Sequence, residues 1–360
     1  MTIRHALPAC VLALLLTTAC GGDSAESDAP AEGATTAVVS GLPGEGGPLG
    51  AVPVPADNPM TDAKVALGHQ LFFDSRMSVD GSRSCYSCHT NEDGNGGGDP
   101  TAIGAADRAL TRHSPVIWNV AYMPAFYWDG RSGALEAQVR GAWGGGNMGV
   151  GADNLDAKAA EIGAIPGYAE QFAAIFPDRG ATGVTVSEAI ASYERTLVCD
   201  ATRYDRHMAG DGSAITEEEA RGLELFNGKG TCAMCHTPPF FSAQFGTDSG
   251  VYYNVGIGHE GRSEDEVDVG RYSVTEADAD WGAFKVPSLR NVAESSPYFH
   301  DGSVVSLEDA VRYMAGGGVP NRNLTPLMMD RNLSDEEITA IVAFMGTLTC
   351  GDLTQPTLPN

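Results

Sequence analysis

Basic residues are scarce in this chain of 360 residues, because 22 Lys and Arg stand against 47 Asp and Glu and leave a formal net charge of −25. So negative a chain repels the phosphate backbone, which argues against a nucleic-acid partner. The charge favours solubility or, alternatively, long-range attraction of a basic redox partner. The acidic stretch 260–280 is the candidate surface for such docking.

Long apolar runs are missing as well. The apolar run 9–16 is far too short to span a bilayer, and no later segment could cross a membrane. Residues 1–19 therefore predict an export signal. Residues 17–20 resemble a bacterial lipobox, which predicts lipidation of Cys20 and a periplasmic protein anchored to the outer membrane. Plain signal cleavage is the alternative. The Gly-, Ala-, Pro- and Ser-rich segment 20–56 predicts a lipidated N-terminus and flexible linker.

Cysteine is scarce too, but its placement is specific. Four of the eight cysteines form two Cys-x-x-Cys pairs, each followed at once by histidine: Cys85-Tyr86-Ser87-Cys88-His89 and Cys232-Ala233-Met234-Cys235-His236. Two thiols at this spacing can add to the two vinyl groups of a haem, and the adjacent histidine can ligate its iron. Zinc binding or disulfide exchange would not need a histidine after each pair. The sequence therefore predicts two covalently bound c-type haems.

Two further cysteines, Cys199 and Cys350, each stand at the end of a predicted helix, whereas Cys10 leaves with the export signal. In an oxidising compartment such a pair favours a disulfide. We expect this bond to close the second domain.

The chain contains an internal repeat. Segments 66–72 and 220–226 share the pattern A-x-G-x-x-L-F of an amphipathic helix ahead of each haem motif. Residues 115–139 align without gaps to 287–311, with nine positions identical and an Asp-Gly pair in both. Each half is thus predicted to be a helix, a haem motif, a loop ending in Asp-Gly, and another helix. Thr216 and Glu219 predict a capping box on the second copy of the first helix.

This plan is that of a small all-α cytochrome c domain, present as two tandem copies with one haem each. We assign residues 57–212 to the N-terminal domain, 213–350 to the C-terminal domain and 351–360 to a tail.

The repeat makes the two haems unequal. Methionine is a common second axial ligand of a c-type haem, and Met314 lies on a helix that Ser306 and Asp309 are expected to cap. The alternative is that Met314 only fills the core. The repeat places Ala142 at the matching position of the first half, and alanine cannot bind iron. The sequence therefore predicts a closed second haem and an open first haem, for which His113 and Met148 are alternative sixth ligands.

By these residues the chain resembles the bacterial dihaem cytochrome c peroxidase family, which includes MauG-type enzymes. The resemblance extends over residues 53–348 and rests on a small set of signature stretches. They are Leu67-Gly68, Leu71-Phe72-Phe73-Asp74, Tyr127-Trp128-Asp129-Gly130-Arg131, Pro287-Ser288-Leu289-Arg290-Asn291 and Pro297-Tyr298-Phe299-His300-Asp301-Gly302.

The resemblance implies a role for individual residues. His89 matches the proximal ligand of a peroxidatic haem, and His236 with Met314 matches the ligand pair of an electron-transfer haem. Trp128 matches a tryptophan that relays electrons between the haems, and Gln138 matches a distal-pocket glutamine. Family members are often homodimers, and they take electrons from a small cytochrome c or cupredoxin.

Three positions depart from the family pattern. Ala105 stands where many members have a distal histidine, and Asn147 stands near the place of the distal glutamate. No Asp or Glu occurs between residues 137 and 152, so a carboxylate that could move the proton of peroxide is missing. His113 replaces an asparagine of the family's interdomain calcium site, which leaves calcium an open expectation.

Three functions are compatible with these features. The leading hypothesis is reduction of hydrogen peroxide at the His89 haem, with electrons delivered through the His236/Met314 haem. A MauG-like enzyme that oxidises side chains of a partner protein is the second, favoured by the departures at Ala105 and Asn147. A dihaem electron carrier without catalysis is the third, and it requires a sixth ligand at both irons.

Overall fold

The computed structural model describes residues 49–360. The predicted export signal, Cys10 and the lipidation site Cys20 lie outside the described residues, as does most of the predicted linker. Within the described range, no helix is both long enough and apolar enough to cross a membrane.

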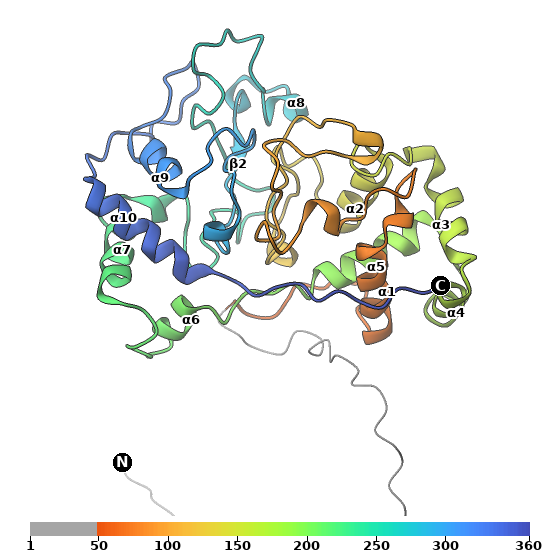
Figure 1. Ribbon diagram of the computed structural model, residues 1–360. Helices are drawn as coiled ribbons and strands as arrows, with labels where there is room; N and C mark the ends of the chain where they lie inside the picture. The colour runs from red at the N-terminus through yellow and green to blue at the C-terminus, as the bar shows by residue number, and fades with distance from the viewer. Residues whose placement is uncertain (1–48) are drawn as a thin grey trace, which may run out of the picture. The chain divides into compact units, whose positions relative to one another are not determined.

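The described chain is mainly helical, which confirms the all-α prediction (Figure 1). The only strands of residues 49–360 are two short antiparallel ones, β1 (Tyr252–Tyr253) and β2 (Phe284–Lys285). The α-helices, in chain order, are α1 (Asp62–Phe73), α2 (Leu135–Gly144), α3 (Leu155–Gly163), α4 (Pro166–Ile175), α5 (Gly183–Glu194), α6 (Arg203–Met208), α7 (Glu217–Asn227), α8 (Tyr272–Thr275), α9 (Leu307–Ala315) and α10 (Asp335–Met345).

The predicted helix caps are present. Thr216 Oγ1 accepts the N–H of Glu219, and the Glu219 carboxylate accepts the N–H of Thr216, so the capping box of α7 is confirmed. Ser306 likewise accepts from the N–H of Asp309 at the start of α9. These bonds satisfy backbone donors that the first turn of a helix leaves free.

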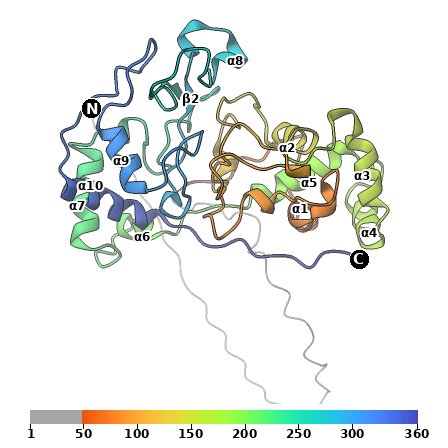
Figure 2. The same ribbon diagram turned by 45° about the horizontal axis from the view of Figure 1, so that its top comes forward.

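The same helix crossing occurs in both halves. Helix α1 packs on α5, and α7 packs on α10; both views keep these pairs side by side (Figures 1 and 2). A Cβ atom on Gly68 of α1 would lie 1.8 Å from the carbonyl oxygen of Ala189. On Gly222 of α7 it would lie 1.9 Å from that of Ala340. The glycine of the repeated A-x-G-x-x-L-F pattern is therefore required by backbone contact between two helices.

Replacing Gly68 with alanine is expected to force α1 away from α5 and to lower the free energy of unfolding by about 3 kcal/mol. Guanidinium unfolding of the two-haem protein measures the effect. Gly133→Ala is the matched control, because nothing lies within 4 Å of a Cβ built there. Equal stability of the two variants would contradict the close crossing.

The two Asp-Gly corners also adopt the same structure. Phe126 bridges to Ser132 around the first corner, and Tyr298 bridges to Val304 around the second. Helix α2 begins at Leu135 and α9 at Leu307, which are aligned positions of the repeat. The repeat deduced from the sequence is thus a structural repeat.

The halves differ in the helices that come after the repeated segment. Helices α3 and α4 stand between α2 and α5 in the first half, whereas α9 is followed directly by α10 in the second. Two apolar cores form, one around residues 65–199 and one around residues 204–348. Tyr204 of α6 packs in the second core although it precedes the expected domain start at residue 213.

Residues after 350, predicted as a tail, pack against the first half. Leu353 is buried in the first core, and its carbonyl accepts from the side chain of Asn91. The carbonyl of Thr354 accepts from the ring of His69, and that of Pro359 from Arg76. The C-terminal segment therefore ties the end of the second half to the first.

A disulfide joins Cys199 to Cys350, with their Cα atoms 5.6 Å apart. It does not close the second domain on itself, because Cys199 is part of the first core. The two cysteines are related by the repeat: the N–H of Cys199 donates to Asn119 Oδ1 at 2.8 Å, and that of Cys350 to Asn291 Oδ1 at 2.7 Å. The disulfide therefore links equivalent points of the two halves.

Candidate functional site

The second haem motif opens into a large cavity with an apolar wall. Cys232, Cys235 and His236 line it together with Met314 of α9. His236 Nδ1 donates to the carbonyl of Phe241 at 3.1 Å, which leaves Nε2 as the ring nitrogen that can ligate a metal. Burial lowers the pKa of His236 to about 4, so the ring is neutral at neutral pH as a ligand must be.

This donor set fits a c-type haem. Two thiols, one imidazole with a free Nε2 and a thioether share one cavity. Five methionines line that cavity (Met123, Met234, Met314, Met328 and Met345), so cavity lining alone does not choose the sixth ligand. The repeat favours Met314, which lies on the helix that follows the Asp-Gly corner and whose counterpart in the first half is Ala142. Met314 as the sixth ligand stays a prediction.

The first haem motif has the same local structure. Cys85 precedes a short 3-10 turn over Tyr86–Cys88, and His89 follows it. His89 Nδ1 donates to the carbonyl of Asn95 at 3.2 Å, and burial lowers the pKa of His89 to about 4. Both proximal imidazoles are thus oriented by a backbone carbonyl and kept neutral by burial. The first motif therefore offers the same thiols and the same free imidazole nitrogen to a haem as the second.

The two unusual positions of the first half lie next to each other. The N–H of Ala105 donates to the carbonyl of Asn147 at 2.9 Å. A Cβ on Gly104 would lie 2.0 Å from the carbonyl of Gly146, so the two loops are in backbone contact. The Asn147 side chain is half-buried and makes no hydrogen bond within residues 49–360. The structure therefore brings together the positions where the sequence lacks a distal histidine and a distal glutamate.

Trp128 lies where the two halves meet. Its side chain belongs to the first half but lines the cavity of the second motif, and its Nε1 donates to the carbonyl of His113 at 2.8 Å. Its own carbonyl accepts from the N–H of Lys285 at 2.8 Å. Both ends of the tryptophan are therefore fixed in place.

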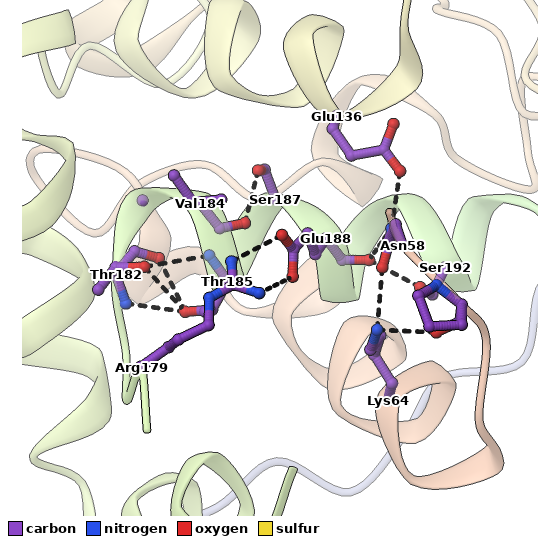
Figure 3. A network of polar contacts seen from close by, with 12 residues as sticks. Asn58, Lys64, Glu136, Arg179, Thr182, Val184, Thr185, Ser187, Glu188 and Ser192 are labelled. Atoms are coloured by element: carbon purple, nitrogen blue, oxygen red, sulfur yellow. Dashed lines mark hydrogen bonds and ion pairs between the residues drawn. The ribbon is translucent and has the colours of Figure 1, made fainter. Parts of the chain in front are cut away.

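Gln138 stands on α2, half-buried, and its carbonyl accepts from the Tyr127 hydroxyl at 3.0 Å. Helix α2 is held by Glu136, whose carboxylate accepts a hydrogen bond from Asn58 at 2.7 Å and forms an ion pair with Arg195, with N and O atoms 2.7 Å apart. Figure 3 shows Glu136 pointing from α2 to the network that Asn58 makes with Lys64. This network fixes α2, and with it Gln138, against α1 and α5.

The alternative ligands of the first haem have other contacts. Met148 is 5% exposed and packs in the first core. His113 lines the cavity of the second motif, and its Nδ1 donates to the carbonyl of Asp99 at 2.9 Å. Packing in the core explains the position of Met148, and the hydrogen bond to Asp99 explains that of His113. Calcium between the domains stays a prediction.

Glu194 is a buried carboxyl that the sequence did not single out. It ends α5, is 7% exposed, and its Oε2 has no hydrogen-bond partner among the described residues. Burial raises the pKa of the Cys85 thiol, and the negative charge of Glu194 raises it further. The Glu194 carboxyl therefore lies beside the first haem motif. Burial raises the pKa of Glu194 to about 8 from an ordinary value of 4.5, so the group is protonated at neutral pH.

The raised pKa of Glu194 predicts a pH-dependent stability. The folded state binds this proton more tightly than the unfolded state, so stability is full below about pH 4.5 and is lost as pH rises towards 8. Between pH 5 and pH 8 the loss is roughly 3 kcal/mol. Guanidinium unfolding across this range should show the slope in the wild type and a flatter one in Glu194→Gln. An unchanged slope would contradict the assignment.

Comparisons with known proteins agree with this geometry. The family model of di-haem cytochrome c peroxidase matches residues 62–213, and that of cytochrome c matches residues 219–349. The cytochrome-c peroxidase IdrP1 of Denitromonas iodatirespirans is 37% identical over 86% of this chain and 87% of that protein. The methylamine utilization protein MauG of Methylorubrum extorquens is 36% identical over 86% of this chain and 85% of that protein.

A solved structure of a MauG-like protein associated with microbial copper homeostasis superposes with a TM-score of 0.75 at 29% identity, covering 82% of this chain and 92% of that one. Two helical units, each with a Cys-x-x-Cys-His turn, define a tandem c-type cytochrome. Within that class, the chain belongs to the dihaem cytochrome c peroxidase family, whose members are peroxidases.

Proposed function

We propose that this protein reduces hydrogen peroxide at the His89 site, with electrons that enter at the His236/Met314 site from a small cytochrome c or cupredoxin. The observation that carries the proposal is the inequality of the two sites. Met314 shares a cavity with His236, whereas the matching residue of the first half is Ala142. One site is therefore suited to electron transfer and the other to a substrate.

The haems and the side chains of the protein have different roles in this proposal. A haem at each motif supplies an iron that exchanges single electrons and, where its sixth position is open, can bind peroxide. His89 and His236 would hold the irons, each through the Nε2 atom that its hydrogen bond at Nδ1 leaves free. Reduction of one hydrogen peroxide to two waters consumes two electrons, which must pass from the second half to the first. Trp128 lies between the two halves and is fixed by its hydrogen bonds to His113 and Lys285.

Gln138 and Asn147 are the polar side chains that the sequence offers to peroxide. An amide can hold the peroxide oxygens by hydrogen bonds, but it cannot take a proton from one oxygen and give it to the other. Proton transfer must then pass through water, which predicts slower turnover than a carboxylate would support.

Stopped-flow mixing of the fully reduced protein with peroxide tests the proposal. We expect reoxidation of both haems with a rate proportional to peroxide concentration and well above that of free haem. A rate no faster than free haem would reject peroxide reduction as the function.

A second function is favoured by the missing carboxylate at Asn147. A MauG-like enzyme would use peroxide to oxidise side chains of a partner protein over a distance. The discriminating experiment adds peroxide to the oxidised protein with no reductant and follows the intact mass of a small secreted protein encoded beside it. A mass change in that protein supports this second function.

The remaining proposals concern location and assembly. We propose export to the periplasm with a lipid anchor at Cys20, and a homodimer of the kind expected from the family. Electrophoretic mobility and mass of the mature protein would test the anchor, because a Cys20→Ser variant would lack the lipid.

A further inference from the structure

Lys285 is a buried lysine with no charged partner. It is 7% exposed, and the only hydrogen-bond partner of its ammonium among the described residues is the sulfur of Met123, at 3.5 Å. Burial is the sole cause that lowers its pKa, to about 8, so no carboxylate lies near enough to offset the cost. An unpaired buried charge is expensive, and proteins as a rule pair or neutralise it.

The cavity that Lys285 faces is free of acidic residues. Among residues 49–360, no Asp or Glu lines it, although the chain as a whole has 47. A lysine and an arginine do line it, Lys285 and Arg331. The negative charge that would balance them must therefore come with the group that fills the cavity.

The two cations differ in their effect on the thiols of the second motif. Burial raises the pKa of both Cys232 and Cys235, and the charge of Arg331 opposes that rise, so Arg331 lies near the thiols. Lys285 is not among the groups that affect the pKa of these thiols. Its backbone N–H donates a hydrogen bond to the carbonyl of Trp128. A haem held through its vinyl groups at Cys232 and Cys235 would carry its two propionate carboxylates on the edge away from the thiols. Lys285 lines the same cavity and is joined through its backbone to Trp128 rather than to the haem motif, which makes its ammonium the candidate partner of such a carboxylate.

We propose that the Lys285 ammonium is the counter-charge for a propionate carboxylate of the second haem. It thereby fixes that edge of the haem beside Trp128 and stabilises the reduced iron. The proposal rests on the haem that Cys232, Cys235 and His236 hold, and it is independent of the reaction with peroxide.

The chain supplies a matched control. Lys64 is also 7% exposed and its pKa is also lowered mainly by burial. Its ammonium, however, donates to Asn58 Oδ1 at 2.9 Å, as Figure 3 shows, and to the carbonyl of Pro59 at 2.8 Å. Lys64 is thus a buried lysine partnered by the protein, away from the haem cavity.

The test is a spectroelectrochemical titration of the two-haem protein without peroxide. In Lys285→Met the unpaired propionate should favour the ferric state of the second haem. We expect its reduced-to-oxidised ratio at fixed potential to fall about tenfold, equal to a midpoint 59 mV lower for one electron. Lys285→Arg, which keeps the charge, and Lys64→Met should both retain the wild-type midpoint.

Should Lys285→Met not accumulate with two haems, Lys285→Gln is titrated in its place, because it keeps the length and polarity of the side chain. A neutral variant with the wild-type midpoint would overturn the proposal, as would an equal shift in Lys64→Met. Peroxide turnover plays no part in either outcome, so failure here is distinct from failure of the proposed peroxidase reaction.

Discussion

Replacing Met314 with alanine is expected to convert the second haem from low-spin to high-spin and to lower its midpoint potential strongly. A thioether stabilises the ferrous state of a c-type haem, and alanine offers no ligand in its place. Electron delivery from an external donor should then slow by at least about tenfold, which corresponds to about 1.4 kcal/mol added to the activation barrier. Electron paramagnetic resonance and donor-coupled turnover measure the two effects.

The cavity itself offers the control for this variant. Met328 also lines the cavity of the second motif, but it has no place in the repeat that relates α2 to α9. Met328→Ala should therefore keep the low-spin signal. Should Met328→Ala lose that signal and Met314→Ala keep it, the assignment of the sixth ligand by the repeat would be wrong.

Restoring a carboxylate at Asn147 is expected to accelerate peroxide reduction about 10²-fold. A general acid–base at the reacting oxygen contributes typically 10²–10⁴-fold, and Asn147 cannot act as one. The Asn147 side chain has no hydrogen bond within residues 49–360, so Asn147→Glu breaks no hydrogen bond of the described residues. Stopped-flow rates with peroxide, at a pH above the carboxyl pKa, measure the gain.

Asn147→Gln separates the effect of the carboxylate from that of side-chain length. It has the length of glutamate but no titrating proton, and it should react at the wild-type rate. Equal rates for Asn147→Glu and Asn147→Gln would show that proton transfer at this position does not limit the reaction. That result would favour the second function, oxidation of a partner protein.

The repeat made much of the fold predictable from the sequence. Each haem motif, each Asp-Gly corner and the starts of α2 and α9 follow from aligned segments, because the same local interactions recur in both halves. The reason for Gly68 and Gly222 was not visible in the sequence, since it lies in contacts with α5 and α10, more than a hundred residues away. Helices α3 and α4 have no counterpart in the second half, and no repeat could predict them.

The pairing of Cys199 with Cys350 was predictable from the sequence, but the place of the disulfide in the fold was predicted incorrectly. Thr196-Leu197-Val198-Cys199 and Thr347-Leu348-Thr349-Cys350 are related sequences, a sign that the two cysteines occupy equivalent positions. The prediction that the bond closes the second domain is wrong, because the bond joins the two halves at points where Asn119 and Asn291 receive equivalent hydrogen bonds.

The candidate site was only partly predictable. Cysteine and histidine spacing identified the haem attachment residues because covalent chemistry imposes that spacing. Glu194 and Lys285 carry no such spacing, and their significance comes from burial without a partner, which only the folded structure reveals. Charged residues of this kind are the ones that sequence patterns leave unnoticed.

We propose that the two haem sites are unequal, with Met314 closing the second and Ala142 leaving the first open. An electron paramagnetic resonance spectrum of the fully oxidised protein distinguishes unequal sites from equal ones. We predict one high-spin ferric signal and one low-spin ferric signal in equal amounts. Two low-spin signals would contradict the account and would favour an electron carrier without catalysis.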